Sequence, residues 1–130
     1  CFDTGILRSV PMLQQRGLLK EPMHISLVMG VASGMPAKAA WLPLLLEEVP
    51  AGARWQTICI GRQNVWEVHR ASAELGGDVR TGLEDTFYLP NGERATTNGA
   101  LVEALVQTVR DSGRQVADIS TTRAAYGLDR

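Results

Sequence analysis

Hydrophobic residues along the chain form short continuous runs, each followed by a longer segment with helical spacing. Apolar runs that end in glycine span 24–30 and 55–61, and a shorter extended run spans 78–83. Runs of this length without strict alternation are typical of strands that are buried on both faces of a sheet. We therefore predict three strands at these positions, and we interpret 1–5 as the tail of a further strand.

Helical segments follow each of these strands. Apolar positions recur at helical spacing within 37–49. The clearest helix is expected to begin with Asn98 as its N-cap and to end at Gly113. The remaining helices are predicted at 6–16, at 62–75, and at 119–126 with Asp118 as its N-cap.

The alternation of strands and helices predicts an α/β fold with parallel strands and right-handed connections. The chain contains about four such strand–helix units plus a short C-terminal helix, all within a single domain over 1–130. Two architectures accommodate this order: an open doubly wound sheet, or half of a (β/α)8 TIM barrel, which needs about 250 residues when complete. The regular spacing, together with polar residues just beyond the strand ends, favours the half-barrel.

Composition narrows the range of partners. The formal net charge is −1, so there is no basic excess of the kind that nucleic-acid binding requires. The most apolar stretch, 25–46, is interrupted by glycine, proline and lysine, which argues against a membrane span. Cys1 and Cys59 form no disulfide framework, so we expect a cytoplasmic, reducing location. The first residue is cysteine and no signal-peptide pattern follows it, so we expect a piece of a longer chain.

The segment 80–85 carries the strongest candidate chemistry, because active sites of parallel α/β folds lie at the C-terminal ends of strands. If the strand stays regular, Arg80 and Glu84 lie on one face and Asp85 on the other. Two adjacent carboxylates repel each other, and an arginine or a metal relieves that repulsion. One carboxylate can bind zinc while the other acts as a base. The alternative is a solvated acidic loop with a surface salt bridge.

Other candidates are weaker. The glycine-rich loop 30–36 precedes a helix and offers backbone amides to an anion, although turn geometry alone explains its glycines equally well. His24 opens a strand and His69 lies within a helix, so we interpret both as structural or exposed. Cys59, between two isoleucines, is predicted to be a small buried hydrophobic residue rather than a nucleophile.

Several short segments, taken in order along the chain, carry a family resemblance. The most specific is Arg80-Thr81-Gly82-Leu83-Glu84-Asp85, which is followed by an aromatic, leucine-containing turn. The set resembles the β-keto acid cleavage enzymes, whose best-known activity is cleavage of 3-keto-5-aminohexanoate. The resemblance covers essentially the whole chain and rests on the segments 2–5, 30–36, 61–62, 80–89, 98–102, 113–117 and 127–128.

The resemblance implies a (β/α)8 barrel with a catalytic zinc ion (Zn2+) at its C-terminal face. It implies cleavage of a β-keto acid with acetyl-CoA as cosubstrate, giving acetoacetate and a new CoA ester. By the same resemblance, Glu84 matches the metal-ligand carboxylate and Asp85 matches the acid/base carboxylate. Arg80 matches an arginine that assists substrate and CoA chemistry. Zinc would polarise the keto oxygen as a Lewis acid.

The family's zinc also takes two histidines from an H-x-H motif, and this chain contains no such motif. We therefore expect the C-terminal half of the barrel, beginning inside the fifth strand and inactive alone. Its expected partners are the missing N-terminal half, further copies in a homo-oligomer, and small-molecule substrates. One alternative is a non-catalytic half-barrel that serves as a binding or structural module. Another is a different metal-dependent barrel lyase or aldolase.

Overall fold

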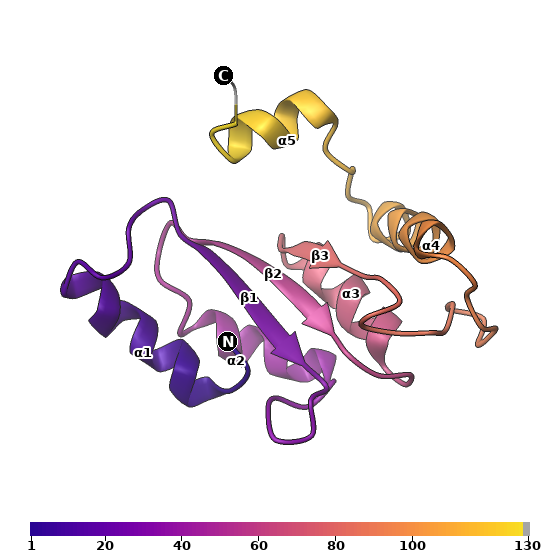
Figure 1. Ribbon diagram of the computed structural model, residues 1–130, viewed down its shortest axis with the longest axis horizontal. Coiled ribbons are helices and arrows are strands. Elements are labelled where there is room, and N and C mark those ends of the chain that lie inside the picture. Colours follow the sequence, from indigo (N-terminus) through magenta and orange to yellow (C-terminus); the bar gives the residue numbers. More distant parts are fainter. Residues whose placement is uncertain (129–130) are drawn as a thin grey trace.

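The computed structural model describes residues 1–128, which form a three-stranded parallel sheet with helices around it (Figure 1). The strands follow chain order across the sheet: β1 (His24–Met29), β2 (Arg54–Cys59) and β3 (Asp78–Arg80). The helices are α1 (Thr4–Gln15), η1 (Ala39–Trp41), α2 (Leu42–Leu46), α3 (Val65–Glu74), α4 (Asn98–Asp111) and α5 (Ile119–Ala125).

The first residue extends the sheet along the outer edge of β1. The Cys1 nitrogen donates to the Ser26 carbonyl at 2.8 Å, and the Val28 N–H donates to the Cys1 carbonyl at 2.9 Å. This pair of bonds is the repeat of a parallel ladder. The predicted strand tail is therefore present but short. The chain turns into α1 already at Thr4, because the Asp3 carboxylate accepts the Ile6 N–H at 2.8 Å and caps the helix.

The hydrophobic core lies between one face of the sheet and helices α1, α2 and α3. Alternate residues of β1 point into it, and the side chains from the helices fill the space between. Its fully buried members include Leu7, Leu27, Met29, Leu42, Cys59, Val65 and Val68.

The opposite face of the sheet is largely polar, and no helix of the described chain packs flat across it (Figure 1). Gln56 donates to the Ser26 hydroxyl at 2.8 Å, and Arg54 pairs with Asp78 at 3.1 Å. The expectation of strands buried on both faces holds along the helix side, and on the opposite face only near the C-terminal ends of the strands. There Val28 and Ile58 are buried, which accounts for the continuous apolar runs.

Several of the expected element boundaries were wrong, including the start of the helix expected at 62–75, which begins at Val65. The segment 37–49 forms η1 and a short α2 rather than one helix, because Pro43 has no N–H with which to continue the helical hydrogen bonds from the preceding turn. β3 ends at Arg80 instead of residue 83. The N-cap of α4 is Thr97, whose hydroxyl accepts the Ala100 N–H at 3.2 Å, and not Asn98.

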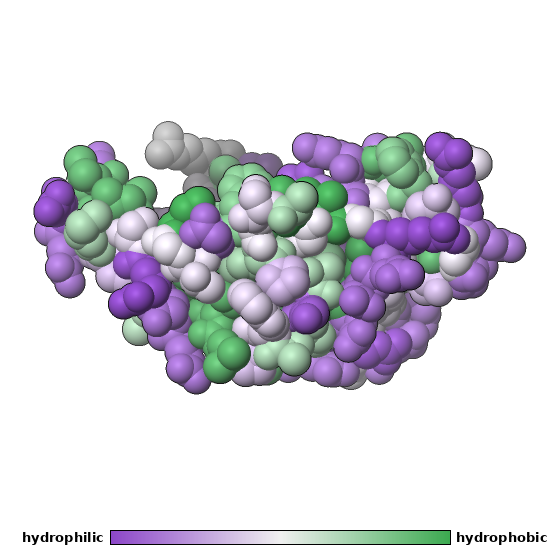
Figure 2. All heavy atoms as spheres, turned by 90° about the horizontal axis from the view of Figure 1, so that it is seen from below, coloured by the Kyte–Doolittle hydropathy of each residue, from purple (hydrophilic) through white to green (hydrophobic). Residues whose placement is uncertain are grey.

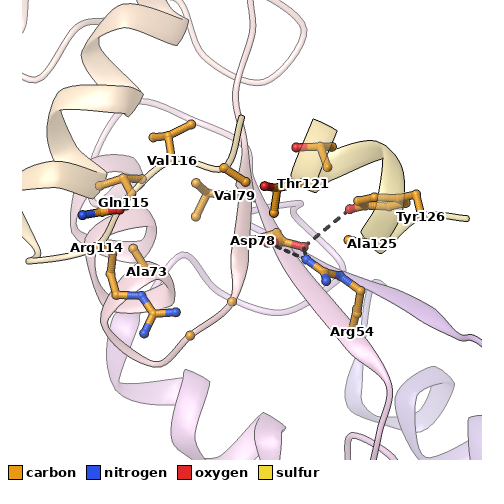
Figure 3. Close-up of a pocket in the computed structure, with 15 residues that line it drawn as sticks. Arg54, Ala73, Asp78, Val79, Arg114, Gln115, Val116, Thr121, Ala125 and Tyr126 are labelled. Carbon is orange, nitrogen blue, oxygen red and sulfur yellow. Dashed lines mark hydrogen bonds and ion pairs between the residues drawn. The ribbon is translucent and has the colours of Figure 1, made fainter. Parts of the chain in front are cut away.

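Helix α5 lies apart from the other helices, on the side where the strands begin (Figure 1). Its Tyr126 ring stacks on His24, with 4.4 Å between ring centroids, and the Tyr126 hydroxyl lies 3.5 Å from an Asp78 oxygen. Figure 3 shows this contact beside the Arg54–Asp78 ion pair, at the margin of a cavity of about 330 Å³. The predicted cap of α5 is confirmed, because Asp118 accepts the Thr121 N–H at 2.7 Å.

The surface over α2 and the preceding loop is apolar. Figure 2 shows hydrophobic residues gathered in the middle of this face and hydrophilic residues toward its sides. Trp41 and Leu44 contribute exposed side chains there, and Leu44 is 62% exposed. Apolar patches of this kind often mark association surfaces. The patch suits the expected homo-oligomer, which stays a prediction.

The α/β class and the parallel order of the strands are confirmed. Three parallel strands with Cys1 beside them are compatible with a sector of a (β/α)8 barrel, and the half-barrel itself stays a prediction. Within residues 1–128, no helix combines the length and the apolar character that crossing a bilayer requires.

Gly30 provides a test of the packing between β1 and β2. Its φ is +91°, and a Cβ there would lie 2.0 Å from the Ile60 carbonyl oxygen, whereas Gly52 has φ +82° and no heavy atom within 4 Å. We expect Gly52→Ala to lower the free energy of unfolding by about 1–2 kcal/mol through backbone strain alone. Gly30→Ala should cost about 3 kcal/mol or more, because overpacking adds to the same strain. Denaturant unfolding measures both variants, and equal losses would contradict the close approach.

His69 provides a test of the buried side of α3. It is fully buried, and neither ring nitrogen has a hydrogen-bond partner within residues 1–128, so burial lowers its pKa to about 4. The unfolded state, with a histidine pKa of about 6.5, therefore binds the proton first as the pH falls. We expect stability to drop between about pH 6.5 and pH 4, by up to about 3 kcal/mol from this residue. Denaturant unfolding at several pH values measures this effect. The free energy of unfolding should depend less steeply on pH in His69→Leu than in the wild type, and as steeply as in the wild type in the control His24→Gln.

Candidate active site

The candidate site lies in a turn directly after β3. The chain leaves the strand at Arg80, and the N–H groups of Asp85 and Thr86 both donate to the Gly82 carbonyl, at 2.9 and 3.0 Å. The turn directs Asp85 back toward Arg80. The expectation that Asp85 lies on the face opposite Arg80 and Glu84 is therefore wrong, because the alternation of an extended strand stops before this segment.

Arg80 holds both carboxylates. Its Nη2 lies 2.6 Å from Glu84 Oε2 and 3.0 Å from Asp85 Oδ1, and its Nε lies 3.3 Å from Asp85 Oδ2. The two bonds to Asp85 form the forked arrangement in which a guanidinium binds a carboxylate most specifically. The predicted relief of carboxylate repulsion by an arginine is confirmed in geometry, and the catalytic role of these residues stays a prediction.

The two carboxylates differ in their surroundings. The Glu84 side chain is 82% exposed, whereas that of Asp85 is 1% exposed. Burial raises the pKa of Asp85, Arg80 opposes that rise, and the negative charge of Glu84 adds to it. Asp85 is therefore a stronger base than an ordinary surface aspartate. The surface salt bridge that the sequence left as an alternative describes Glu84 but not Asp85.

Two neighbouring elements anchor the turn. The Gly61 N–H, just beyond β2, donates to the Asp85 carbonyl at 3.0 Å. From the other side, Asn98 Oδ1 accepts the Leu83 N–H at 2.8 Å. The sequence indicated Asn98 as a helix cap and as part of the family resemblance, but not as a contact of this turn. Both Thr97 and Asn98 are good N-cap residues, so the pattern alone could not show which of them was free to reach the turn.

The remaining candidates behave as structural residues. Burial, with a smaller contribution from the negative charge of Asp85, raises the pKa of the Cys59 thiol to about 12, so it is a neutral buried group as expected. His24 lies at the start of β1, at the opposite edge of the sheet, and His69 is buried in α3. Within residues 1–128, no hydrogen bond or ion pair joins either histidine to Arg80, Glu84 or Asp85.

Turn geometry accounts for the glycine-rich loop after β1. The Gly30 N–H donates to the Met35 carbonyl at 2.7 Å, and the Met35 N–H donates to the Phe2 carbonyl at 2.8 Å. A Cβ on Gly34 would lie 2.4 Å from the Phe2 carbonyl oxygen. These amides are engaged, and the glycines permit close backbone approach, whereas anion binding by the remaining amides of the loop stays a prediction.

A complete zinc site is not present within residues 1–128, where no three histidine, cysteine, aspartate or glutamate side chains lie close enough together to hold a metal ion. Glu84 has the donor chemistry of a zinc ligand, with one oxygen on Arg80 and a largely exposed side chain. The described residues thus supply one carboxylate of the expected type and not the full set that zinc requires.

Comparison with known proteins identifies relatives along nearly the whole chain. A 3-keto-5-aminohexanoate cleavage enzyme of Fusobacterium nucleatum is 33% identical over 127 residues, covering 98% of this chain and 46% of the relative. A 3-oxoadipate:acetyl-CoA acetyltransferase of Cupriavidus necator is 35% identical over 130 residues, covering 98% and 45%. A 3-dehydrocarnitine:acetyl-CoA trimethylamine transferase of Rhizobium meliloti is 36% identical over 115 residues, covering 88% and 38%.

The chain therefore spans less than half the length of these curated relatives. Residues 1–128 also match the sequence profile of a family described as beta-keto acid cleavage enzyme. This match includes the turn that carries Arg80, Glu84 and Asp85. The chain belongs to the beta-keto acid cleavage enzyme family.

Proposed function

We propose that this chain is the C-terminal half of a (β/α)8 barrel enzyme that exchanges acyl groups between a β-keto acid and acetyl-CoA. In this reaction C2 bonds to the acetyl carbon as the thioester C–S bond breaks, and the CoA sulfur bonds to the keto carbon as the bond between C2 and the keto carbon breaks. The products are acetoacetate and a CoA ester of the remaining acyl group. Family membership and the relatives' names support the reaction class. The observation that carries the proposal is a buried aspartate held by a forked arginine at a strand's C-terminal end.

Asp85 is the general base in this proposal. Forming a carbon nucleophile requires removal of a proton from C2, next to the keto group, and its later return. A carboxylate whose basicity is increased by burial suits both steps. Because Arg80 binds both oxygens of Asp85, it keeps the carboxylate charged and fixed in direction.

Arg80 also has a second task. Its Nε and Nη2 are engaged by the two carboxylates, whereas Nη1 forms no hydrogen bond within residues 1–128. The Arg80 side chain is 41% exposed, so this nitrogen is accessible from outside the fold. We assign it to the substrate carboxylate or to the negative charge that develops on an oxygen during acyl exchange.

Glu84 is the proposed zinc ligand. It is exposed, and its second oxygen is free of hydrogen bonds within residues 1–128. Zinc, when bound, would supply Lewis-acid polarisation of the keto carbonyl. Since a catalytic zinc usually takes three protein ligands, the remaining ligands would come from segments outside residues 1–128. For this reason we expect the isolated chain to be inactive.

The sheet offers two positions for the other half of the barrel. Within residues 1–128, the sheet continues beyond β1 through Cys1 and an isolated bridge between Met29 and Met35, and no strand pairs with the outer edge of β3. Closing a barrel requires strands to add at both of these edges. An N-terminal half of four strands would complete the ring and cover the polar face of the sheet.

The role of Asp85 is tested with Asp85→Asn, which keeps the shape of the side chain and removes the base. We expect the complete wild-type enzyme to form acetoacetate from acetyl-CoA and a β-keto acid. In the same enzyme, Asp85→Asn should lower kcat by about 10²–10⁴-fold. The matched control is Asp78→Asn, which removes a carboxylate from a similar arginine pair at the other end of β3. Zinc content should stay unchanged in both. A normal rate in Asp85→Asn would contradict the assignment.

The role of Glu84 is tested with Glu84→Ala. Loss of a ligand should lower the zinc content measured by metal analysis of purified protein, and kcat should fall with it. Glu93→Ala removes another exposed carboxylate from the loop that follows and should change neither quantity. Full zinc occupancy in Glu84→Ala would contradict the assignment and show that other residues hold the metal.

A further inference from the structure

The turn 82–85 is attached to helix α4 by one side chain. Asn98 Oδ1 accepts the Leu83 N–H at 2.8 Å, across fifteen residues of sequence. Leu83 directly precedes Glu84 and Asp85. Its backbone position therefore sets where both carboxylates leave the chain.

Asn98 is free for this contact because its neighbour performs the capping. The Thr97 hydroxyl accepts the Ala100 N–H at 3.2 Å, and Thr97 has the extended backbone of an N-cap. Asn98 is the first residue of α4, so its side chain is carried by a helix of 14 residues rather than by a loop. Thr97 therefore caps the helix, while Asn98 bonds to the turn.

The fit around the Asn98 carboxamide is close. A Cβ on Gly82 would lie 3.1 Å from Asn98 Oδ1, so the glycine leaves the space that the carboxamide occupies. On its other side the turn is held by the Gly61 N–H, which donates to the Asp85 carbonyl at 3.0 Å. The turn is therefore fixed between the end of β2 and the start of α4.

We propose that Asn98 is a positioning residue for the acyl exchange reaction: it holds the turn 82–85 in the conformation that brings Glu84 and Asp85 together at Arg80. This proposal rests on the proposed function of that cluster. Asn98 bonds to a backbone amide and to neither carboxylate, so it acts through the turn. Small displacements of reacting groups cost large factors in rate, which makes such an anchor important for turnover.

The test uses three variants of the complete enzyme. Asn98→Ala removes the acceptor, and Asn98→Asp keeps an oxygen acceptor at a helix N-terminus, where a carboxylate is favoured. Thr97→Ala removes the cap from the same helix end without touching the turn. The measurements are kcat, KM for acetyl-CoA, the melting temperature, and hydrogen exchange of the Leu83 amide.

We expect Asn98→Ala to lower kcat by about 10–100-fold with a smaller change in KM, and to speed exchange of the Leu83 amide at least tenfold. Asn98→Asp should restore most of both. Thr97→Ala should lower the melting temperature, while kcat and Leu83 exchange stay near the wild-type values. This pattern separates loss of the turn anchor from simple weakening of α4.

Wild-type kcat in Asn98→Ala would overturn the proposal, as would an equal loss of kcat in Thr97→Ala. Unchanged Leu83 exchange in Asn98→Ala would overturn it independently of any activity. A different result would separate the two proposals. If the wild-type enzyme forms no acetoacetate, the proposed function is wrong. Hydrogen exchange of the Leu83 amide that still changes only in the Asn98 variants would then show that Asn98 holds the turn.

Discussion

The arrangement of the candidate site depends on burying one negative charge next to one positive charge. An unpaired aspartate in the position of Asp85 would lose its hydration and gain nothing in return. The fork from Arg80 offsets that cost, but buried ion pairs seldom add net stability compared with apolar residues of the same size. Under the proposed function, the chemistry that such a pair permits accounts for its burial. The turn, the anchors on either side of it and the exposed Glu84 all follow from keeping these two groups together.

The two ends of the strands carry similar ion pairs that differ in how far they are enclosed. At the start of the strands, Arg54 and Asp78 form a pair that is about two-fifths exposed and is covered from one side by Tyr126. At the other end of β3, Arg80 and Asp85 form a pair whose aspartate is almost fully enclosed. In (β/α)8 folds, catalytic residues lie at the C-terminal ends of the strands, and residues at the N-terminal ends contribute to stability. The contrast in enclosure of Asp78 and Asp85 agrees with that division.

The sequence predicted the strands and most helices because their signals are local. Apolar runs closed by glycine identify β1 and β2, and Asp118 identifies the start of α5 by the same hydrogen bond that the structure shows. The motif around residues 80–85 also indicated three charged residues that the structure brings together, and their catalytic roles stay a prediction. What it could not show was their geometry, because the turn depends on contacts with Gly61 and Asn98, which are far away in sequence. Asn98 was assigned to a local task for the same reason.

Helix α5 is joined to the strand starts chiefly through one aromatic ring. None of its seven residues is buried, and Tyr126 supplies the stack on His24 and the contact with Asp78. An element with so little buried surface opens with a free energy well below that of global unfolding. Its detachment would bare the first residues of the strands while leaving the carboxylates at their far ends in place. Opening at the N-terminal ends of the strands therefore need not disturb the geometry at their C-terminal ends.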